Sequence, residues 1–283
     1  MIDCDTPSNG ASGALGGKEK FMRRKVLTLT FTRVVWIAFV AMVTLTIADV
    51  ASAQSGNIYQ TTLGEPNQKT GEVSTEELRR ILVDSSAIVL DTRKRSEYVA
   101  GHIPGARNVA PPTNVPPSEY VDAVKRLVGG DKSKALVLYC NGPFCQASRQ
   151  LGERLVAAGF TNVRRYQLGM PIWRALGGPT EIELEGIVRI FNIDRTAVFF
   201  DTRSPEEFAK RSLPGTHNVP ASQLASGVLD KAPLPMDDFN TRVVLFGRDS
   251  AQARVLADAL SKRPWHNVTY FPGTFEMLRL AIK

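Results

Sequence analysis

Two cysteines five positions apart are the side chains of this chain best suited to covalent chemistry. Cys140 and Cys145 lie in the run Leu-Val-Leu-Tyr-Cys-Asn-Gly-Pro-Phe-Cys-Gln, residues 136–146. A thiolate attacks electrophilic sulfur, exchanges with disulfides and binds soft metals. The sequence holds 3 cysteines, the third being Cys4. One pair is too sparse for a disulfide scaffold and offers too few ligands for a closed zinc site. We therefore expect nucleophilic or redox chemistry at sulfur, with no metal and no cofactor.

The residues around the pair predict a strand, a loop and a helix. Residues 136–139 are all apolar, which is typical of a strand buried on both faces. Asn141-Gly142-Pro143 forces a turn, and apolar residues then recur at helical spacing until Gly159. The start of a helix presents unpaired N–H groups and a partial positive charge. A thiol at Cys140 is therefore expected to ionise more readily than usual.

A second polar motif occurs twice in the chain. Asp91-Thr92-Arg93 follows a predicted buried strand over residues 87–90, and Asp201-Thr202-Arg203 follows a similar apolar run. Further matches continue in one register after each motif, which indicates a tandem repeat. In the second copy the strand over 243–246 leads to Gly247 where the first copy has Cys140. The second copy is therefore predicted to keep the scaffold and to lack the nucleophile.

Strands that alternate with helices predict an α/β fold of two tandem domains, each a parallel sheet flanked by helices. Polar groups at the carboxyl ends of such strands meet at one rim, where open α/β sheets bind ligands. The predicted boundaries are 54–71 for a flexible lead-in, 72–180 for a catalytic domain and 181–283 for an inactive domain.

Residues 1–53 have the layout of a secretory signal peptide. Basic residues at 23–25 precede an apolar stretch over 34–47, and Ala51-Ser52-Ala53 forms a small-residue cleavage site. Met22 is a plausible alternative start. The apolar stretch is shorter than the ~20 residues that span a bilayer, which favours cleavage after Ala53 over an uncleaved anchor. We expect a periplasmic or secreted protein with no stable membrane span after cleavage.

The charge distribution argues against nucleic-acid binding. The formal net charge is +7, but the basic residues are scattered and no nucleic-acid motif is present. A solvated surface explains such a pattern better than a phosphate-binding face.

Together these motifs resemble the rhodanese family, specifically its tandem sulfurtransferases of the thiosulfate and 3-mercaptopyruvate type. The match is carried by Asp91-Thr92-Arg93, by the run Gly-His-Ile-Pro-Gly-Ala at 101–106, by Tyr139-Cys140, and by Leu213-Pro214-Gly215 in the repeat. The resemblance implies that Cys140 accepts a sulfane sulfur from a donor such as thiosulfate. The resulting persulfide then passes that sulfur to cyanide or to a thiol acceptor.

The resemblance and the loop together define the expected site. Cys140 is the expected catalytic residue. The expected substrate-binding residues are Asn141, Gly142, Phe144, Cys145, Gln146, Arg149 and Arg93. Supporting structural roles are expected for Asp91, Glu97 and His102. Because Asp201 and Arg203 persist without a cysteine, a scaffold ion pair is favoured for Asp91 and Arg93.

The sequence departs from the family pattern in ways that leave alternatives open. The cysteine lies in the first copy, whereas tandem members commonly keep it in the second. The family loop often ends in Arg where this chain has Cys145, and Pro143 removes a backbone N–H from the loop. Cys145 is either a resolving cysteine that forms a disulfide with Cys140 or a small residue in the Arg position.

Other classes of protein compete with a sulfurtransferase. A periplasmic thiol–disulfide redox protein that uses both cysteines is one, and a non-catalytic binding module is another. The second domain is either a wall for substrate specificity or a binding site for a protein partner. A Cys–His hydrolase is disfavoured because His102 belongs to a Pro-Gly turn and His217 and His266 belong to the other copy.

Overall fold

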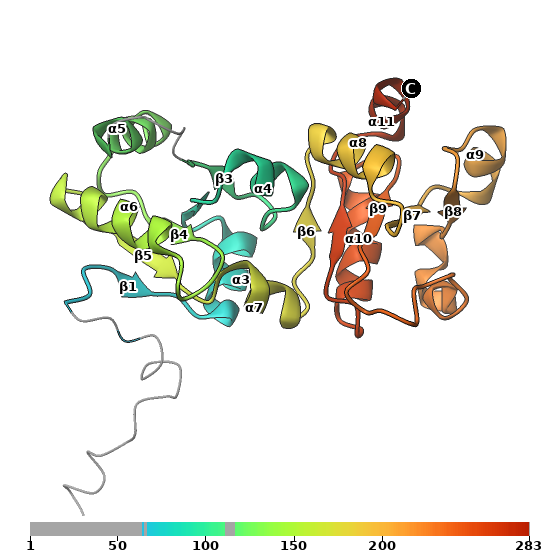
Figure 1. The fold of residues 1–283 in the computed structure, drawn as a ribbon, viewed down its shortest axis with the longest axis horizontal. Coiled ribbons are helices and arrows are strands. Elements are labelled where there is room, and N and C mark those ends of the chain that lie inside the picture. The colour runs from blue at the N-terminus through green and yellow to red at the C-terminus, as the bar shows by residue number, and fades with distance from the viewer. Residues whose placement is uncertain (1–63, 65–66, 111–116, 283) are drawn as a thin grey trace, which may run out of the picture. The chain divides into compact units, whose positions relative to one another are not determined.

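The computed structural model describes Gly64 and residues 67–110 and 117–282 (Figure 1). The predicted signal peptide and most of the predicted lead-in lie outside these residues. The chain divides into the units Met1–Gly64 and Glu65–Lys283, and every element below belongs to the second unit. Among the residues described, no helix is both long enough and apolar enough to cross a membrane.

The first domain is built on a five-stranded sheet in which every strand pairing is parallel. The strands are β1 (Gly71–Glu72), β2 (Ile88–Asp91), β3 (Arg107–Asn108), β4 (Leu136–Tyr139) and β5 (Val163–Tyr166), in the order β1-β5-β4-β2-β3. The helices are α3 (Thr75–Asp84), α4 (Arg95–Ala100), α5 (Pro117–Leu127), α6 (Gln146–Ala157) and α7 (Gly169–Ala175).

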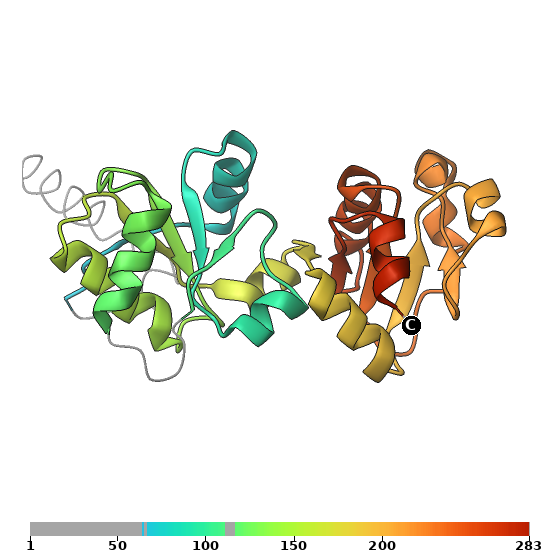
Figure 2. The same cartoon turned by 90° about the horizontal axis from the view of Figure 1, so that it is seen from above.

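The central strand β4 explains why helices cover both faces of this sheet. All four of its residues are buried. Because side chains alternate along a strand, Val137 and Tyr139 pack in one apolar cluster with residues of α3 and α7. Leu136 and Leu138 pack in another with residues of α5 and α6. The continuous apolar run is therefore what a doubly covered parallel strand requires, and the two helical layers are visible in Figure 2.

The second domain repeats this topology. Its strands are β6 (Thr180–Glu181), β7 (Val198–Asp201), β8 (Thr216–Asn218), β9 (Val243–Phe246) and β10 (Val268–Tyr270), all parallel in the order β6-β10-β9-β7-β8. Its helices are α8 (Leu184–Ile193), α9 (Pro205–Lys210), α10 (Ser250–Ser261) and α11 (Phe275–Ala281), with short 3-10 turns η1 (Ala221–Ser226) and η2 (Val228–Asp230). The predicted α/β fold with two tandem parallel sheets is confirmed.

The junction between the domains is a short antiparallel bridge. His102 and Glu181 exchange backbone hydrogen bonds of 2.9 and 2.8 Å, and Glu183 N donates to Val99 O at 3.1 Å. Thr180, which the sequence assigns to the first domain, pairs with Thr269 of β10 and so lies in the second sheet. Gly71 begins the first sheet in the same way, at the end of the predicted lead-in.

Candidate active site

The cysteine loop lies at the carboxyl end of β4, where it turns into α6. Cys140 follows the last strand residue and is 3% exposed, and Cys145 is the residue that caps the start of α6. The two sulfurs are joined in a disulfide, and the Cα atoms are 6.1 Å apart, within the range that such a bond spans. The loop is therefore described in its oxidised form, while the role of Cys145 as a resolving residue stays a prediction.

Backbone contacts hold this loop from both sides. Cys145 N donates to Gly142 O at 3.0 Å, and Met170 N donates to Cys140 O at 3.1 Å. Gly142 has φ +111°, a conformation that glycine adopts without strain. Gly169, at φ +62°, packs so closely that a Cβ there would overlap Cys140 O and Gly142 N. The start of α7 thus fixes the position of the Cys140 carbonyl group.

The predicted loop ligands lie together, with their side chains turned in different directions. Gly142 is buried, while Gln146 at the start of α6 is exposed and Phe144 is 94% exposed. Asn141 donates from Nδ2 to Glu97 Oε1 at 2.6 Å, which ties the loop to α4. Glu97 therefore supports the loop through Asn141.

Arg93 lies in a buried ion pair beneath the loop. Its Nη2 is 2.5 Å from Asp91 Oδ2 and also donates to Gly101 O at 2.8 Å. Tyr139 donates its hydroxyl proton to the same Asp91 oxygen at 2.6 Å. Burial alone would lower the pKa of Arg93, but the hydrogen bonds and charge of Asp91 raise it. Burial first, and then the charge of Asp91, raise the pKa of Tyr139. The guanidinium group of Arg93 therefore binds Asp91 and the Gly101 carbonyl group.

Arg149 and His102 form contacts outside the cysteine loop. Arg149 forms an ion pair with Glu153 at 3.0 Å and lines a surface cavity with Asn67 and Lys69 that contains no residue of the cysteine loop. His102 is buried, stacks on Tyr98 with 3.8 Å between ring centroids, and places Nε2 3.6 Å from Glu181 Oε1. His102 is therefore held at the domain junction, and the substrate-binding role expected for Arg149 stays a prediction.

Within the residues described, no cluster of His, Cys, Asp and Glu side chains is suited to hold a metal ion. The arrangement is thus a cysteine pair on a backbone-lined loop at a helix start, above a buried Asp–Arg–Tyr network.

One protein-family model matches both halves of the chain. The model described as "Rhodanese-like domain" matches residues 74–176 and 190–279, one match in each half of the chain. The chain belongs to the rhodanese-like family. The predicted family resemblance and the tandem arrangement are confirmed.

The comparisons also match individual proteins and solved structures. The chain is 31% identical over 135 residues to the HTH-type transcriptional regulator Rv0324 of Mycobacterium tuberculosis, a match that covers 48% of this chain and 52% of the relative. It therefore spans about half the length of that curated relative. Among solved structures, a thiosulfate sulfurtransferase from Pseudomonas aeruginosa is 19% identical with a TM-score of 0.33, covering 75% of this chain and 42% of that one. The 3-mercaptopyruvate sulfotransferase SseA from Escherichia coli is 19% identical with a TM-score of 0.33, covering 73% of this chain and 99% of that one.

The second rhodanese-like domain keeps the Asp–Arg pair, but Phe246 replaces the tyrosine and Gly247 stands at the position of the cysteine. Arg203 binds Asp201 at 2.6 Å as Arg93 binds Asp91, and Phe275 N donates to Gly247 O at 2.8 Å. A Cβ on Gly247 would overlap the side chains of Thr202 and Gln252. The Gln252 amide oxygen accepts a hydrogen bond from Arg248 N at 2.8 Å, so a side chain of this domain occupies its own loop.

Sequence reasoning missed two residues of the site, Gly169 and Met170. Both lie at the carboxyl end of β5, beside the loop that follows β4, and the sequence predicts that strands of this sheet are parallel. The sequence offered one signal for Gly169, namely that it is a glycine shortly after the predicted strand 163–166, whose carboxyl end lies on the same rim of the sheet as Cys140. The missed role of Tyr139, as a hydroxyl donor to Asp91, required knowing which face of β4 it occupies.

Proposed function

We propose that the chain is a sulfurtransferase in which Cys140 carries a sulfane sulfur as a persulfide. The observation that supports this most directly is the placement of Cys140 at the end of β4, before a loop that closes on the start of α6. Membership of the rhodanese-like family favours sulfur transfer over other thiol chemistry. A donor such as thiosulfate and an acceptor such as cyanide or a thiol complete the proposal.

The reaction consists of two displacements at sulfur. The Cys140 thiolate attacks the outer sulfur of thiosulfate, the sulfur–sulfur bond of the donor breaks, and sulfite leaves with the electron pair. Cyanide or a thiolate then attacks the outer sulfur of the persulfide and releases the Cys140 thiolate. Because Arg93 is committed to Asp91, stabilisation of the negative charge falls to the loop N–H groups and the positive end of α6.

The Cys140–Cys145 disulfide makes this activity dependent on redox state. A dithiol reductant must open the bond before Cys140 can attack a donor. In the persulfide form, the Cys145 thiolate can attack the inner Cys140 sulfur and expel hydrosulfide, which regenerates the disulfide. Cys145 is then a resolving residue that limits the lifetime of the persulfide.

Two further parts of the proposal concern the compartment of the protein and the role of its second domain. Export through the expected signal peptide would bring the protein to a periplasmic or extracellular compartment, where disulfides persist. The second domain, with its loop self-occupied, is proposed to serve as a binding module for a protein partner rather than as a second catalyst.

A thiol–disulfide redox protein is the second candidate, and the closed Cys140–Cys145 bond is the observation that favours it. Such a protein would exchange disulfides with dithiols and would take up no sulfur. A purely binding module would do neither.

Intact mass spectrometry of the reduced mature protein after treatment with thiosulfate, with and without cyanide, tests the proposal. We expect wild type to gain one sulfur atom that cyanide removes, Cys140→Ser to gain none, and Cys145→Ser to hold the sulfur longer than wild type. A loss of two hydrogens in wild type, together with no sulfur uptake by Cys145→Ser, would favour the redox protein. No change in mass under any condition would favour the binding module.

A further inference from the structure

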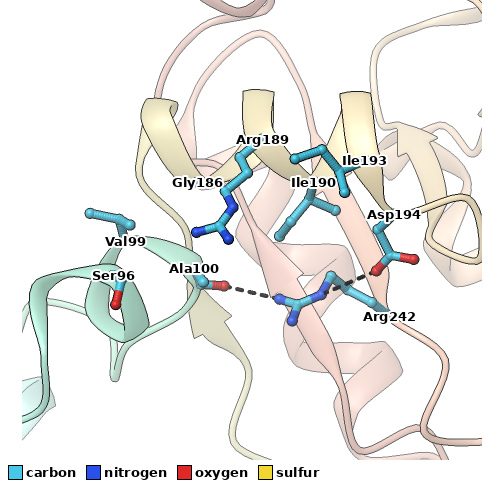
Figure 3. Close-up of a pocket in the computed structure, with 9 residues that line it drawn as sticks. All are labelled: Ser96, Val99, Ala100, Gly186, Arg189, Ile190, Ile193, Asp194 and Arg242. Carbon is cyan, nitrogen blue, oxygen red and sulfur yellow. Dashed lines mark hydrogen bonds and ion pairs between the residues drawn. The ribbon is translucent and has the colours of Figure 1, made fainter.

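A second cavity lies away from the cysteine loop, between α4 of the first domain and α8 of the second. Its volume is about 290 Å³. It is lined by Ser96, Val99, Ala100, Gly186, Arg189, Ile190, Ile193, Asp194 and Arg242. A Cβ on Gly186 would overlap Val99 O, so the backbones of α4 and α8 are in direct contact on one side of the cavity. Figure 3 shows the guanidinium groups of Arg189 and Arg242 pointing into the same space.

These two arginines have few acceptors. Arg242 donates from Nη1 to Ala100 O at 3.0 Å, while its Nε is buried without a hydrogen-bond partner among the residues described. The carboxylate in the lining, Asp194, forms an ion pair of 4.0 Å with that nitrogen through Oδ2, while its Oδ1 accepts from Thr196 N and Oγ1 at 3.0 and 2.7 Å. For the exposed Arg189, the structure describes no ion pair or hydrogen bond.

The electrostatics of the neighbourhood show an excess of positive charge. Burial lowers the pKa of Arg242, and the nearby charge of Asp194 opposes this only in part. Burial, together with the charges of Arg242 and Arg93, lowers the pKa of Arg174 to about 10. Arg174 Nε is also buried without a hydrogen-bond partner in the described part of the chain. Buried polar groups that lack partners are uncommon in folded proteins and carry a free-energy cost, which a bound anion would remove.

The remaining walls are apolar. Val99 and Ala100 on α4 face Ile190 and Ile193 on α8 across the cavity (Figure 3). An inorganic anion would leave this surface uncovered, whereas a short hydrocarbon group would bury it, with a gain of about 25 cal/mol per Å². Ligand cavities usually measure about 300–1,000 Å³, so a volume of about 290 Å³ fits a molecule of a few carbon atoms.

We propose that this cavity binds a small aliphatic carboxylate, with the carboxylate group between Arg189 and Arg242 and the hydrocarbon part against Val99, Ile190 and Ile193. Guanidinium groups bind carboxylates through paired, charge-assisted hydrogen bonds. The site is separate from the sulfur chemistry and does not depend on it. Because its walls come from both domains, the ligand stabilises the junction between them.

Calorimetric titration of the full-length mature protein with butanoate tests the site, with 1-butanol and inorganic phosphate as comparison probes. We expect saturable binding of butanoate, and binding of 1-butanol and of phosphate at least tenfold weaker. Arg189→Gln is the informative variant because Arg189 is exposed and its loss should leave the fold intact. It should weaken butanoate binding about tenfold, which corresponds to about 1.4 kcal/mol.

Arg195→Gln provides the matched control, because Arg195 is exposed on the same segment but does not line the cavity. Its affinity for butanoate should equal that of wild type. The proposal is overturned if butanoate binding does not saturate, if phosphate binds as tightly as butanoate, or if Arg195→Gln loses as much affinity as Arg189→Gln. Sulfur uptake by Cys140 should be unchanged in both variants, so the outcome is independent of the proposed sulfur transfer.

Discussion

Substitution of Gly169 by alanine tests whether the start of α7 positions the cysteine loop. Gly169 has φ +62°, and a Cβ there would overlap Cys140 O and Gly142 N and lie 3.0 Å from Gly142 Cα. The nearby atoms belong to the backbone, which cannot rotate aside as a flexible side chain does. The loop must therefore shift, and the hydrogen bond from Met170 N to Cys140 O, 3.1 Å long, must lengthen or break.

The expected loss of stability has two parts. An alanine in the left-handed region costs about 1–2 kcal/mol, and forcing a methyl group into a packed site costs about 1–3 kcal/mol more. Gly105 gives a matched control, because its φ is +77° and a Cβ there meets nothing within 4 Å. Gly105→Ala should therefore show the backbone cost alone. Gly169→Ala should lose about 2 kcal/mol more than Gly105→Ala.

Urea denaturation of the oxidised proteins measures both losses in free energy of unfolding. The rate at which a dithiol reduces the Cys140–Cys145 bond measures the loop itself, and it should rise in Gly169→Ala and stay at the wild-type value in Gly105→Ala. If the two variants lose the same stability and reduce at the same rate, Gly169 does not hold the loop and the assignment of this role is wrong.

Two further predictions use the repeat and a surface ion pair. Asp91→Asn should lose about 3–5 kcal/mol of stability in urea denaturation because it leaves the buried Arg93 without its charge partner. Asp201→Asn should lose about 1–2 kcal/mol less, because Phe246 stands where Tyr139 donates a hydrogen bond to Asp91; equal losses would contradict a role for that bond. The hydrogen bond from Arg248 lowers the pKa of Glu207 from 4.5 to about 2, so the stabilisation by ionised Glu207 is complete above pH 4.5 and is lost as the pH falls towards 2. The urea midpoints of wild type and Glu207→Gln should accordingly differ most above pH 4.5 and converge below it, and a constant difference would refute the assignment.

Much of the fold was predictable because strong local patterns agreed with the tertiary structure. The apolar runs 136–139 and 243–246 became β4 and β9 with the predicted bounds, since strands covered on both faces need apolar side chains at every position. The position of Cys140 at a strand end and of Cys145 at a helix start followed from the same run. The repeat made the second sheet predictable from the first.

The loop contacts were not predictable from local patterns. The pairing of Arg93 with Asp91 was favoured by the second copy, but the further hydrogen bond from Arg93 to Gly101 O depends on the rotamer of Arg93. Whether two cysteines five positions apart meet depends on the turn at Gly142. The close approach of Gly169 to Cys140 brings together the ends of β4 and β5, which are 27 residues apart in the sequence. Patterns of residues along a short stretch of chain do not specify such a contact between two strands.

The two domains separate the residues needed for the fold from those needed for chemistry. Asn108 donates to Asp91 O and Arg93 O, and Asn218 donates in the same way to Asp201 O and Arg203 O. The second domain therefore has all of these contacts around its Asp–Arg pair, although Gly247 stands at its cysteine position and is enclosed by Thr202 and Gln252.

Because the Asp–Arg pair and its asparagine contacts are present in a domain without the cysteine, they stabilise the rim of the sheet and are not specific to chemistry at the cysteine. What the first domain has in addition is the cysteine pair, the Asn141 contact to Glu97 and the hydroxyl group of Tyr139. Variants that separate the proposed sulfur transfer from stability should therefore be sought among these residues and not in the Asp–Arg pair.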